Sequence, residues 1–471
     1  MKDSKLISLF STFEKKEWRR FREFLESPYF NKRKDIVKLY QYIASLAPDF
    51  PEAKLNNAFV FKKIFPTQPY DDKQLKYVMN YLLKQAERFL IERKLESSTP
   101  LMNNFLLDAL VNRKLDKHYK SRAEKISKEL IFHQIESIDY YYYKYQLSDI
   151  ANLHYTIQNI RKYDAHLQDV ANGLDEFYFL NKLKYSCEMI NRSKVLVDDY
   201  ELKFIEEVVK YLEQEEEQAI PLIAIYLQIF YTLKKENAEA HFERLKEILS
   251  IYQEELPNKE KRTIYLYAIN YCVAQISSSA NQIYYVEECL KLYMVGIEQE
   301  FLFVNGYLSP WTFKNAVRLG LNLKRYDWTE QFIQKYYQKL AIEFQEDALH
   351  YNLADLAFRR KDYKTAQYQL LLVEFSDIFY SLGAKEMLLK IYYENQEIEA
   401  LFALIASFSI YLRRNKKIAQ NFRETYLNFT MLLQQVLRAK PQKIPKMIDK
   451  INNTPLLTNR SWLLEICEDL K

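Results

Sequence analysis

Glycine is scarce in this sequence: there are 5 in 471 residues, and the first is Gly173. An average protein has about 7 % glycine. Glycine-rich phosphate loops, dinucleotide-binding turns and tight β-hairpins need residues that adopt positive φ or let a ligand approach the backbone closely. The lack of glycine therefore excludes these sites and architectures. Together with only 12 prolines, it favours helices joined by short polar turns.

Cysteine and histidine are also few. The chain has 4 cysteines and 6 histidines, with no Cys-x-x-Cys pair and no His-Glu-x-x-His spacing. Disulfide frameworks and structural zinc sites depend on such spacings, so the sequence predicts no metal and no cofactor. The cysteines lie in apolar, helical-looking surroundings, which predicts that they are reduced and buried in a cytoplasmic protein.

Long apolar runs are missing as well. The N-terminal apolar run is too short for a signal peptide and is soon followed by charged residues. The most apolar stretch, residues 218–233, is 16 residues long, and a membrane-spanning helix needs roughly 20. The sequence therefore predicts no membrane insertion and a cytoplasmic location.

Apolar residues recur almost everywhere with the period of a helix. In the N-terminal region Trp18, Phe21, Phe24 and Leu25 follow a 3–4 spacing. Amphipathic segments of similar character follow one another to the end of the chain. The predicted fold class is all-α.

A recurring break separates the later segments. Asn322-Leu323-Lys324-Arg325-Tyr326-Asp327 and Arg359-Arg360-Lys361-Asp362-Tyr363 place cations at the end of one helix and aspartate at the start of the next. Cations favour a helix C-terminus, and aspartate caps an N-terminus. Asp327, Asp362 and Glu397 are 35 residues apart in succession. This spacing is close to the 34-residue period of tetratricopeptide repeats.

Residues 309–410 resemble the tetratricopeptide family. Leu353, Ala354 and Ala366 stand where the repeat keeps leucine, a small residue and alanine, and Gly320 occupies the small position one repeat earlier. The resemblance implies a right-handed α-solenoid of helical hairpins. The wider sequence, including residues 309–315 and 412–416, is similar to an uncharacterised group of tetratricopeptide-like proteins from the Bacteroidota with no assigned activity.

Four regions are predicted from these patterns. They are an N-terminal basic helical domain (1–96), degenerate helical hairpins (97–308), tetratricopeptide-like repeats (309–410) and a basic C-terminal helical cap (411–471).

No motif in the sequence identifies a reaction. A serine nucleophile elbow needs flanking glycines, which are absent. Arg113-x4-His118 and Arg161-x4-His166 resemble the Arg–His pair of helical HEPN ribonucleases, but Asp116 and Asp164 are expected to break the helix between the two residues. We therefore expect a non-enzymatic protein, although an active site assembled from distant polar residues would leave no local signal.

The predicted function is that of a scaffold or adaptor that binds a protein or peptide partner on the concave face of the repeats. Polar residues at i, i+3 and i+7 on two successive first helices can hydrogen-bond an extended peptide and its carboxylates. Solvation of an exposed helix face explains the same pattern. The candidate residues are Asn315, Arg318, Asn322, Asn352, Asp355 and Arg359.

The alternative function is that of a nucleic-acid-associated regulator. Residues 1–95 hold 20 Lys and Arg against 12 Asp and Glu, and residues 410–450 hold 10 against 2, so both ends are basic around an acidic middle. The basic ends are solvated surface or complement the acidic middle of the same chain in one interpretation, and in the other they bind nucleic acid or an acidic partner, with membrane-surface binding as the remaining alternative. The aromatic residues beside the N-terminal arginines are expected in the core. The candidate basic residues are Arg19, Arg20, Arg22, Arg413, Arg414, Lys416 and Lys417.

Overall fold

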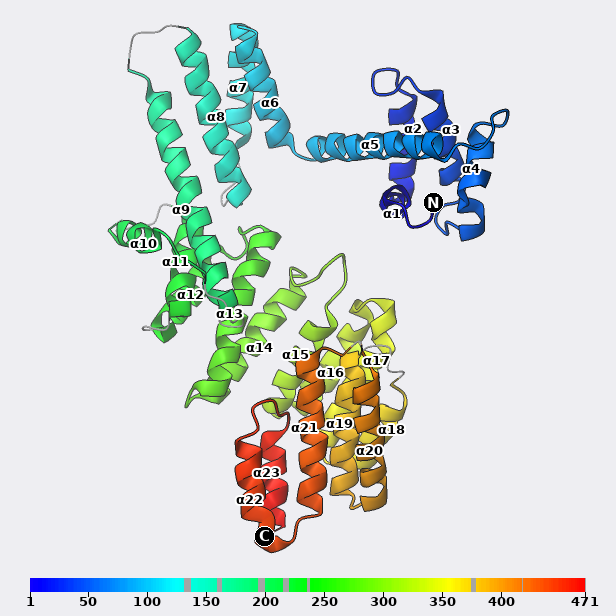
Figure 1. Ribbon diagram of the computed structural model, residues 1–471. Helices are drawn as coiled ribbons and strands as arrows, with labels where there is room; N and C mark the ends of the chain where they lie inside the picture. The colour runs from blue at the N-terminus through cyan, green and yellow to red at the C-terminus, as the bar shows by residue number, and fades with distance from the viewer. Residues whose placement is uncertain are drawn as a thin grey trace. The chain divides into compact units, whose positions relative to one another are not determined.

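The computed structural model describes residues 1–130, 137–158, 163–193, 200–214, 220–234, 238–373, 378–416 and 418–470 (Figure 1). Within these ranges the chain forms 23 α-helices, three short 3-10 helices and no β-strand, which confirms the all-α fold class. The chain divides into two compact units, Met1–Tyr178 (unit 1) and Phe179–Lys471 (unit 2). The division falls inside helix α9 (Ala165–Ser193).

Unit 1 begins with short helices and continues with longer ones. Its helices before α9 are α1 (Lys5–Phe10), α2 (Lys15–Glu26), α3 (Lys34–Ala44), α4 (Asn57–Ile64), α5 (Asp72–Glu96), α6 (Thr99–Asn112), α7 (Asp116–Leu130) and α8 (Ile138–Ile157), with a 3-10 turn at Glu52–Leu55. The long helix α5 packs against each of α1 to α4 (Figure 1).

An aromatic core holds α1 to α5 together. Phe10, Phe21 and Phe89 are almost completely buried and their rings contact one another, with Phe10 to Phe21 centroids 5.7 Å apart and Phe21 to Phe89 centroids 5.2 Å apart. Every residue of this core lies between Leu6 and Phe89, inside the range predicted for the N-terminal domain. Large rigid rings bury much apolar area with little loss of side-chain entropy.

A second, smaller core joins α6, α7 and α8. Its buried residues are Leu107, Val111, Tyr119, Ile126 and Ile150.

Unit 2 is a longer series of helices. They are α10 (Ile205–Glu213), α11 (Pro221–Lys234), α12 (Ala238–Tyr252), α13 (Asn258–Ser278), α14 (Gln282–Glu298), α15 (Pro310–Asn322), α16 (Tyr326–Tyr336), α17 (Ile342–Arg359), α18 (Tyr363–Leu371), α19 (Ile378–Glu394), α20 (Ile398–Arg414), α21 (Gln420–Leu437), α22 (Ile444–Asn452) and α23 (Arg460–Asp469). Two 3-10 turns lie at Tyr337–Lys339 and Pro441–Lys443.

From α13 to α21, each helix of unit 2 packs against the next helix in the chain. In addition, α15 packs against α17, and α17 packs against α19. Gly320 in α15 permits one of these contacts, because a Cβ atom there would lie 2.6 Å from Oγ1 of Thr329 in α16. Ala354 and Ala366 are completely buried between α17 and its neighbours. The small residues therefore stand where helices approach closely.

The recurring breaks are helix C-caps with one shared geometry. Lys324, Lys361 and Gln396 have φ of 56°, 62° and 57°. The amide after each donates to a carbonyl five residues back: Arg325 to Gly320 (3.0 Å), Asp362 to Ala357 (2.9 Å) and Glu397 to Tyr392 (2.8 Å). This is the Schellman arrangement, in which a left-handed residue ends the helix and satisfies its last carbonyls.

The aspartates after these breaks do not all act as predicted. Asp362 caps α18, with its Oδ1 accepting from the Thr365 amide at 3.1 Å. Asp327 is instead the second residue of α16, whose N-cap is Arg325, and its carboxylate pairs with Arg360 at 2.8 Å. The helix starts earlier than predicted because the Schellman turn already reverses the chain at Lys324.

The last five helices of unit 2 share one core. Leu389 of α19, Leu401 of α20, Phe429 of α21, Ile451 of α22 and Leu463 of α23 are all completely buried in it. Residues on both sides of the boundary that the sequence predicts after position 410 therefore pack into one core.

No helix in the described part of the chain is long and apolar enough to cross a membrane.

Candidate functional site

A groove of about 740 Å³ lies in unit 2. Side chains from α15, α17, α19, α21 and α23 line it, and these helices are labelled in Figure 1. The lining combines charged side chains with the aromatic rings of Tyr351, Phe358, Tyr426 and Trp462. Such a surface offers both charge pairing and flat apolar contacts to a ligand.

Asp355 of α17 is a largely enclosed charged group of the groove, with a side chain 13 % exposed. Burial raises the pKa of Asp355, although four cations favour its ionised form: Arg359, Arg318, Lys314 and Lys390. Arg359 stands one turn further along α17, with Nε 3.7 Å from Oδ1 of Asp355.

Arg318 of α15 is exposed and borders the groove. Its guanidinium forms no hydrogen bond or ion pair with any residue that the structure describes, although it acts electrostatically on Asp355, Tyr351 and Tyr426. A planar guanidinium with five N–H donors is well suited to bind an oxyanion through two parallel hydrogen bonds.

Lys390 connects α19 to the start of the last helix, α23. Its ammonium lies 3.3 Å from Oε1 of Glu386, donates to Oδ1 of Asn459 at 2.6 Å, and lies 5.7 Å from the ring centroid of Trp462. Burial raises the pKa of Tyr426, and the neighbouring Glu386 adds to this effect. The α23 side of the groove is thus held by polar contacts between residues far apart in the sequence.

Tyr351 forms the floor where α17 and α19 meet. Gly383 makes room for it, because a Cβ atom at Gly383 would lie 2.6 Å from the Tyr351 hydroxyl oxygen. The Lys314 ammonium lies 4.2 Å from the Tyr351 ring centroid, a cation–π contact. Burial raises the pKa of Tyr351 well above its usual value, so its hydroxyl remains a hydrogen-bond donor.

Three of the six predicted partner-binding residues line the groove: Arg318, Asp355 and Arg359. Asn315 is exposed but does not line it, and its amide donates to the Tyr293 hydroxyl at 3.1 Å. Asn322 is exposed at the end of α15 and also lies outside the lining.

Asn352 is a correction to the prediction. It is completely buried, and its Nδ2 donates to the Ala348 carbonyl one turn earlier at 2.6 Å. Helices α15, α16, α18 and α19 all pack against α17, so only a narrow strip of that helix reaches the groove. Helical spacing alone predicts that the Asn352 side chain is accessible, but the helices packed on both sides of α17 bury it.

Sequence reasoning missed Lys314, Tyr351 and Lys390 as groove residues. A signal for them existed, because Tyr351, Asp355 and Arg359 are each four residues apart, and Lys314 precedes Arg318 by four. Lys390 stands 35 residues after Asp355, which is the spacing of the recurring breaks. The contributions of α21 and α23 left no local signal.

The predicted basic residues fall in separate units. Arg19, Arg20 and Arg22 are exposed on α2, and Arg413, Arg414 and Lys416 are exposed at and after the end of α20. Lys417 lies outside the described residues. Phe21 and Phe24 are buried and Trp18 packs on the same core, as expected, so the rings beside the N-terminal arginines are not free to stack on bases.

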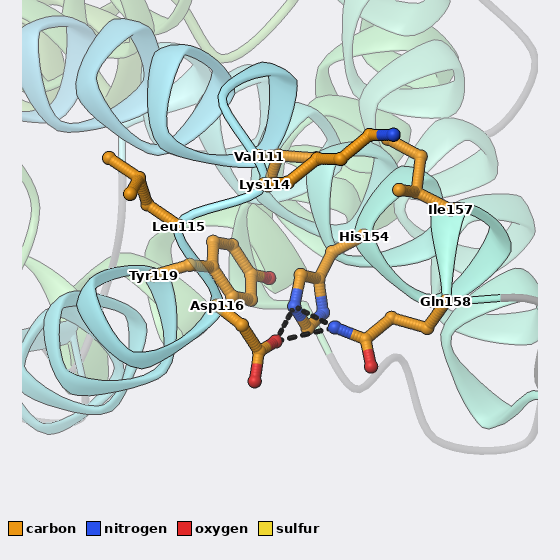
Figure 2. A pocket seen from close by; sticks show the side chains of 8 residues that line it. All are labelled: Val111, Lys114, Leu115, Asp116, Tyr119, His154, Ile157 and Gln158. Atoms are coloured by element: carbon orange, nitrogen blue, oxygen red, sulfur yellow. Dashed lines mark hydrogen bonds and ion pairs between the residues drawn. The ribbon is translucent and has the colours of Figure 1, made fainter.

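A small pocket of about 180 Å³ lies in unit 1 where α7 begins and α8 ends. Figure 2 shows Asp116, His154 and Gln158 converging there. His154 Nε2 lies 2.6 Å from Oδ1 of Asp116, and Gln158 Nε2 donates to the same oxygen at 2.5 Å. The His154 ring stacks on Tyr119, with centroids 4.0 Å apart.

Asp116 is held ionised in this pocket. Lys120, at 2.9 Å, and the hydrogen bond from His154 lower its pKa to about 2. The carboxylate therefore accepts the Nε2 proton of His154 and orients the ring. The pocket lining contains no serine, threonine or cysteine that the imidazole could activate. The hydrogen bond between Asp116 and His154 connects the start of α7 to the end of α8.

The ribonuclease-like pair Arg113–His118 is split as expected. Arg113 ends α6, His118 belongs to α7, and Lys114 between them has φ of 55°. In the other pair, Arg161 lies outside the described residues. Among the described residues, no group of three or more His, Cys, Asp or Glu side chains could hold a metal ion.

All four cysteines, Cys187, Cys272, Cys289 and Cys467, are buried thiols that form no disulfide with a described residue, which confirms that part of the sequence prediction. Burial raises the pKa of Cys289 to about 12 and raises those of Cys187 and Cys272 further. Cys187, Cys272 and Cys289 are therefore protonated, unreactive core residues.

The fold and the groove together define an all-helical protein with a charged, aromatic-lined groove formed by its later helices. Comparison of the chain with protein-family models, curated proteins and solved structures finds no match.

Proposed function

We propose that unit 2 is a tetratricopeptide-like solenoid that binds a segment of a protein partner in its groove, and that the protein acts as a non-enzymatic scaffold or adaptor. The observation that carries the proposal is the groove itself. One face of α15, α17 and α19 contributes Arg318, Asp355 and Lys390 to a single surface with tyrosine and tryptophan rings.

The dimensions and chemistry of the groove fit an extended peptide. A volume of about 740 Å³ accommodates several residues, and the lining offers donors, acceptors and flat rings along three successive helices. The packing of α15 on α17 and of α17 on α19 supports the solenoid part of the proposal, because stacked first helices are what a repeat array buries.

The experiment is photo-crosslinking in the native host. A photoreactive amino acid replaces Phe358, which lines the groove, or Tyr368, which is 60 % exposed on α18 and lies outside it. We expect defined protein adducts from position 358 that position 368 does not form. They should disappear in the Arg318→Glu background and remain in Arg413→Glu, which places the same charge change on an exposed residue elsewhere.

Identical adducts from both positions, or adducts from position 358 that persist in Arg318→Glu, would show that the groove is not the binding site. Circular dichroism of each variant confirms that it is folded.

A further inference from the structure

Charged side chains of both signs line the groove. The cations are Lys314, Arg318, Arg359, Lys361 and Lys390, and the carboxylates are Asp355, Glu386, Glu394 and Glu465. Glu386 pairs with Lys390 at 3.3 Å, and Asp355 pairs with Arg359 at 3.7 Å. The Arg318 guanidinium forms no hydrogen bond or ion pair with any residue that the structure describes, so a further anion can pair with it.

Four cations act electrostatically on the Asp355 carboxylate. They are Arg359, Arg318, Lys314 and Lys390. Its side chain is 13 % exposed, and burial of an ionised carboxylate costs free energy unless nearby cations offset it. Any second anion that enters the groove shares those cations with Asp355 and is repelled by it. Arg318 is exposed, so its guanidinium is open to such an anion.

We infer that the groove recognises an oxyanion on the bound segment, that this group binds at Arg318, and that Asp355 competes with it for the surrounding cations. The inference rests on the proposed function and specifies the chemistry of the segment. The oxyanion is the carboxylate of an acidic side chain or the phosphate of a phosphorylated one, both of which a guanidinium can bind in two places.

Two substitutions should shift affinity in opposite directions. Arg318→Gln removes the anchoring cation and is expected to weaken binding of an anionic peptide roughly tenfold or more, because charge-assisted hydrogen bonds are lost. Asp355→Asn removes a like charge near the bound anion and is expected to strengthen binding by roughly three- to tenfold. If Asp355 only stabilised the groove, its substitution would weaken binding instead.

The test uses the full-length chain and immobilised 12-residue peptide pools with acetylated and amidated ends. The pools are random except for a central glutamate, phosphoserine or glutamine. Blocking both ends removes terminal charges, so retention reports on side chains. Arg413→Gln is the matched control, because Arg413 is an exposed arginine that does not line the groove.

We expect the wild-type chain to be retained more by the glutamate or phosphoserine pool than by the glutamine pool, and the pool retained identifies the source of the oxyanion. Arg318→Gln should abolish this preference, Asp355→Asn should increase retention, and Arg413→Gln should change neither.

Equal retention on all three pools would overturn the inference while leaving peptide binding in place. Retention on none of them would overturn the proposed function as well. Unchanged or weaker binding by a folded Asp355→Asn variant would show that Asp355 does not compete. The wild-type comparison of glutamate and glutamine pools stands even if a variant fails to fold.

Discussion

The Tyr226 hydroxyl donates a hydrogen bond of 3.0 Å to Oε2 of Glu260 in the interior of unit 2. The other carboxylate oxygen, Oε1, lies 3.4 Å from the Lys184 ammonium, and the Glu260 side chain is 2 % exposed. Burial raises the pKa of Tyr226, and the charge of Glu260 raises it further. α13 is thereby connected to α9 and α11 by a buried charge with two partners.

Glu260→Ala should lower the free energy of unfolding by about 3 kcal/mol, because it leaves a buried hydroxyl without its acceptor and a partly buried ammonium without its counter-ion. Glu260→Gln keeps an acceptor and should cost about half as much. Urea unfolding followed by circular dichroism measures both. Glu247→Ala, at an exposed ion pair on α12, is the control and should cost under about 0.5 kcal/mol. Equal effects at the two positions would contradict the prediction.

Lys324→Gly should stabilise the protein. Lys324 has φ of 56° at the end of α15, a conformation that costs an L-residue roughly 1 kcal/mol and that glycine adopts freely. We expect a gain of about 0.5 kcal/mol after the greater unfolded-state entropy of glycine is included. Lys210→Gly, at an exposed position in the last turn of α10, should lower the free energy of unfolding by about 0.5–1 kcal/mol. Thermal unfolding of both variants shows whether the two changes in stability have opposite signs. A loss of stability in Lys324→Gly would argue against the Schellman geometry.

Gly320→Ala should destabilise the α15–α16 contact. The added Cβ atom would meet Oγ1 of Thr329 at 2.6 Å and the Trp328 ring at 2.7 Å. Helix propensity favours alanine by about 1 kcal/mol, whereas overpacking costs about 1–3 kcal/mol, so we expect a net loss. A variant with unchanged or higher thermal stability would mean that α16 is not packed this closely.

Unit 1 should lose stability in acid through Asp116. Its pKa falls from 3.8 to about 2 on folding, so its stabilising contribution is complete above about pH 4 and is lost as the pH falls towards 2. Asp116→Asn should flatten the pH dependence of the melting temperature in that window. Asp149→Asn, an exposed acid on α8, should leave the profile unchanged. Identical profiles for the wild type and Asp116→Asn would contradict the arrangement in Figure 2.

The nucleic-acid alternative makes a separate prediction. Phosphate binding weakens steeply between about 50 and 200 mM salt. Because the rings beside Arg19, Arg20 and Arg22 pack in the core, base stacking adds nothing there, and nucleic-acid binding by the basic ends would depend on phosphate pairing alone. We expect the groove and not the basic ends to be the binding surface, so reversing the charges of Arg413, Arg414, Lys416 and Lys417 together should change nothing in a filter-binding assay. Retention that is steeply salt-dependent and lost in the reversed variant would support the alternative.

The helical fold and its breaks could be predicted because both depend on neighbours in the sequence. The spacing of Trp18, Phe21 and Phe24 correctly predicts the buried face of α2, and the cation-rich breaks correctly predict the ends of α15 and α17. The role of Asp327 was not predictable, because its partner Arg360 lies 33 residues later, at the end of α17.

The candidate site was predictable only in part. The helical spacing within α15 and α17 selected Arg318, Asp355 and Arg359, which line the groove. Asn352 was misjudged because burial depends on how many helices surround α17. The His154–Asp116 pair was missed because its members lie 38 residues apart on different helices.

The order of residues alone determined that this protein is helical, where many of its helices end and that its thiols lie inside, since turn chemistry and hydrophobic period act over a few residues. Tertiary structure decided which faces meet. The contact of Lys390 with Asn459 spans 69 residues and depends on how α19, α21 and α23 pack around a common core. Side-chain shape determines that packing, and for this reason the groove is a property of the folded chain.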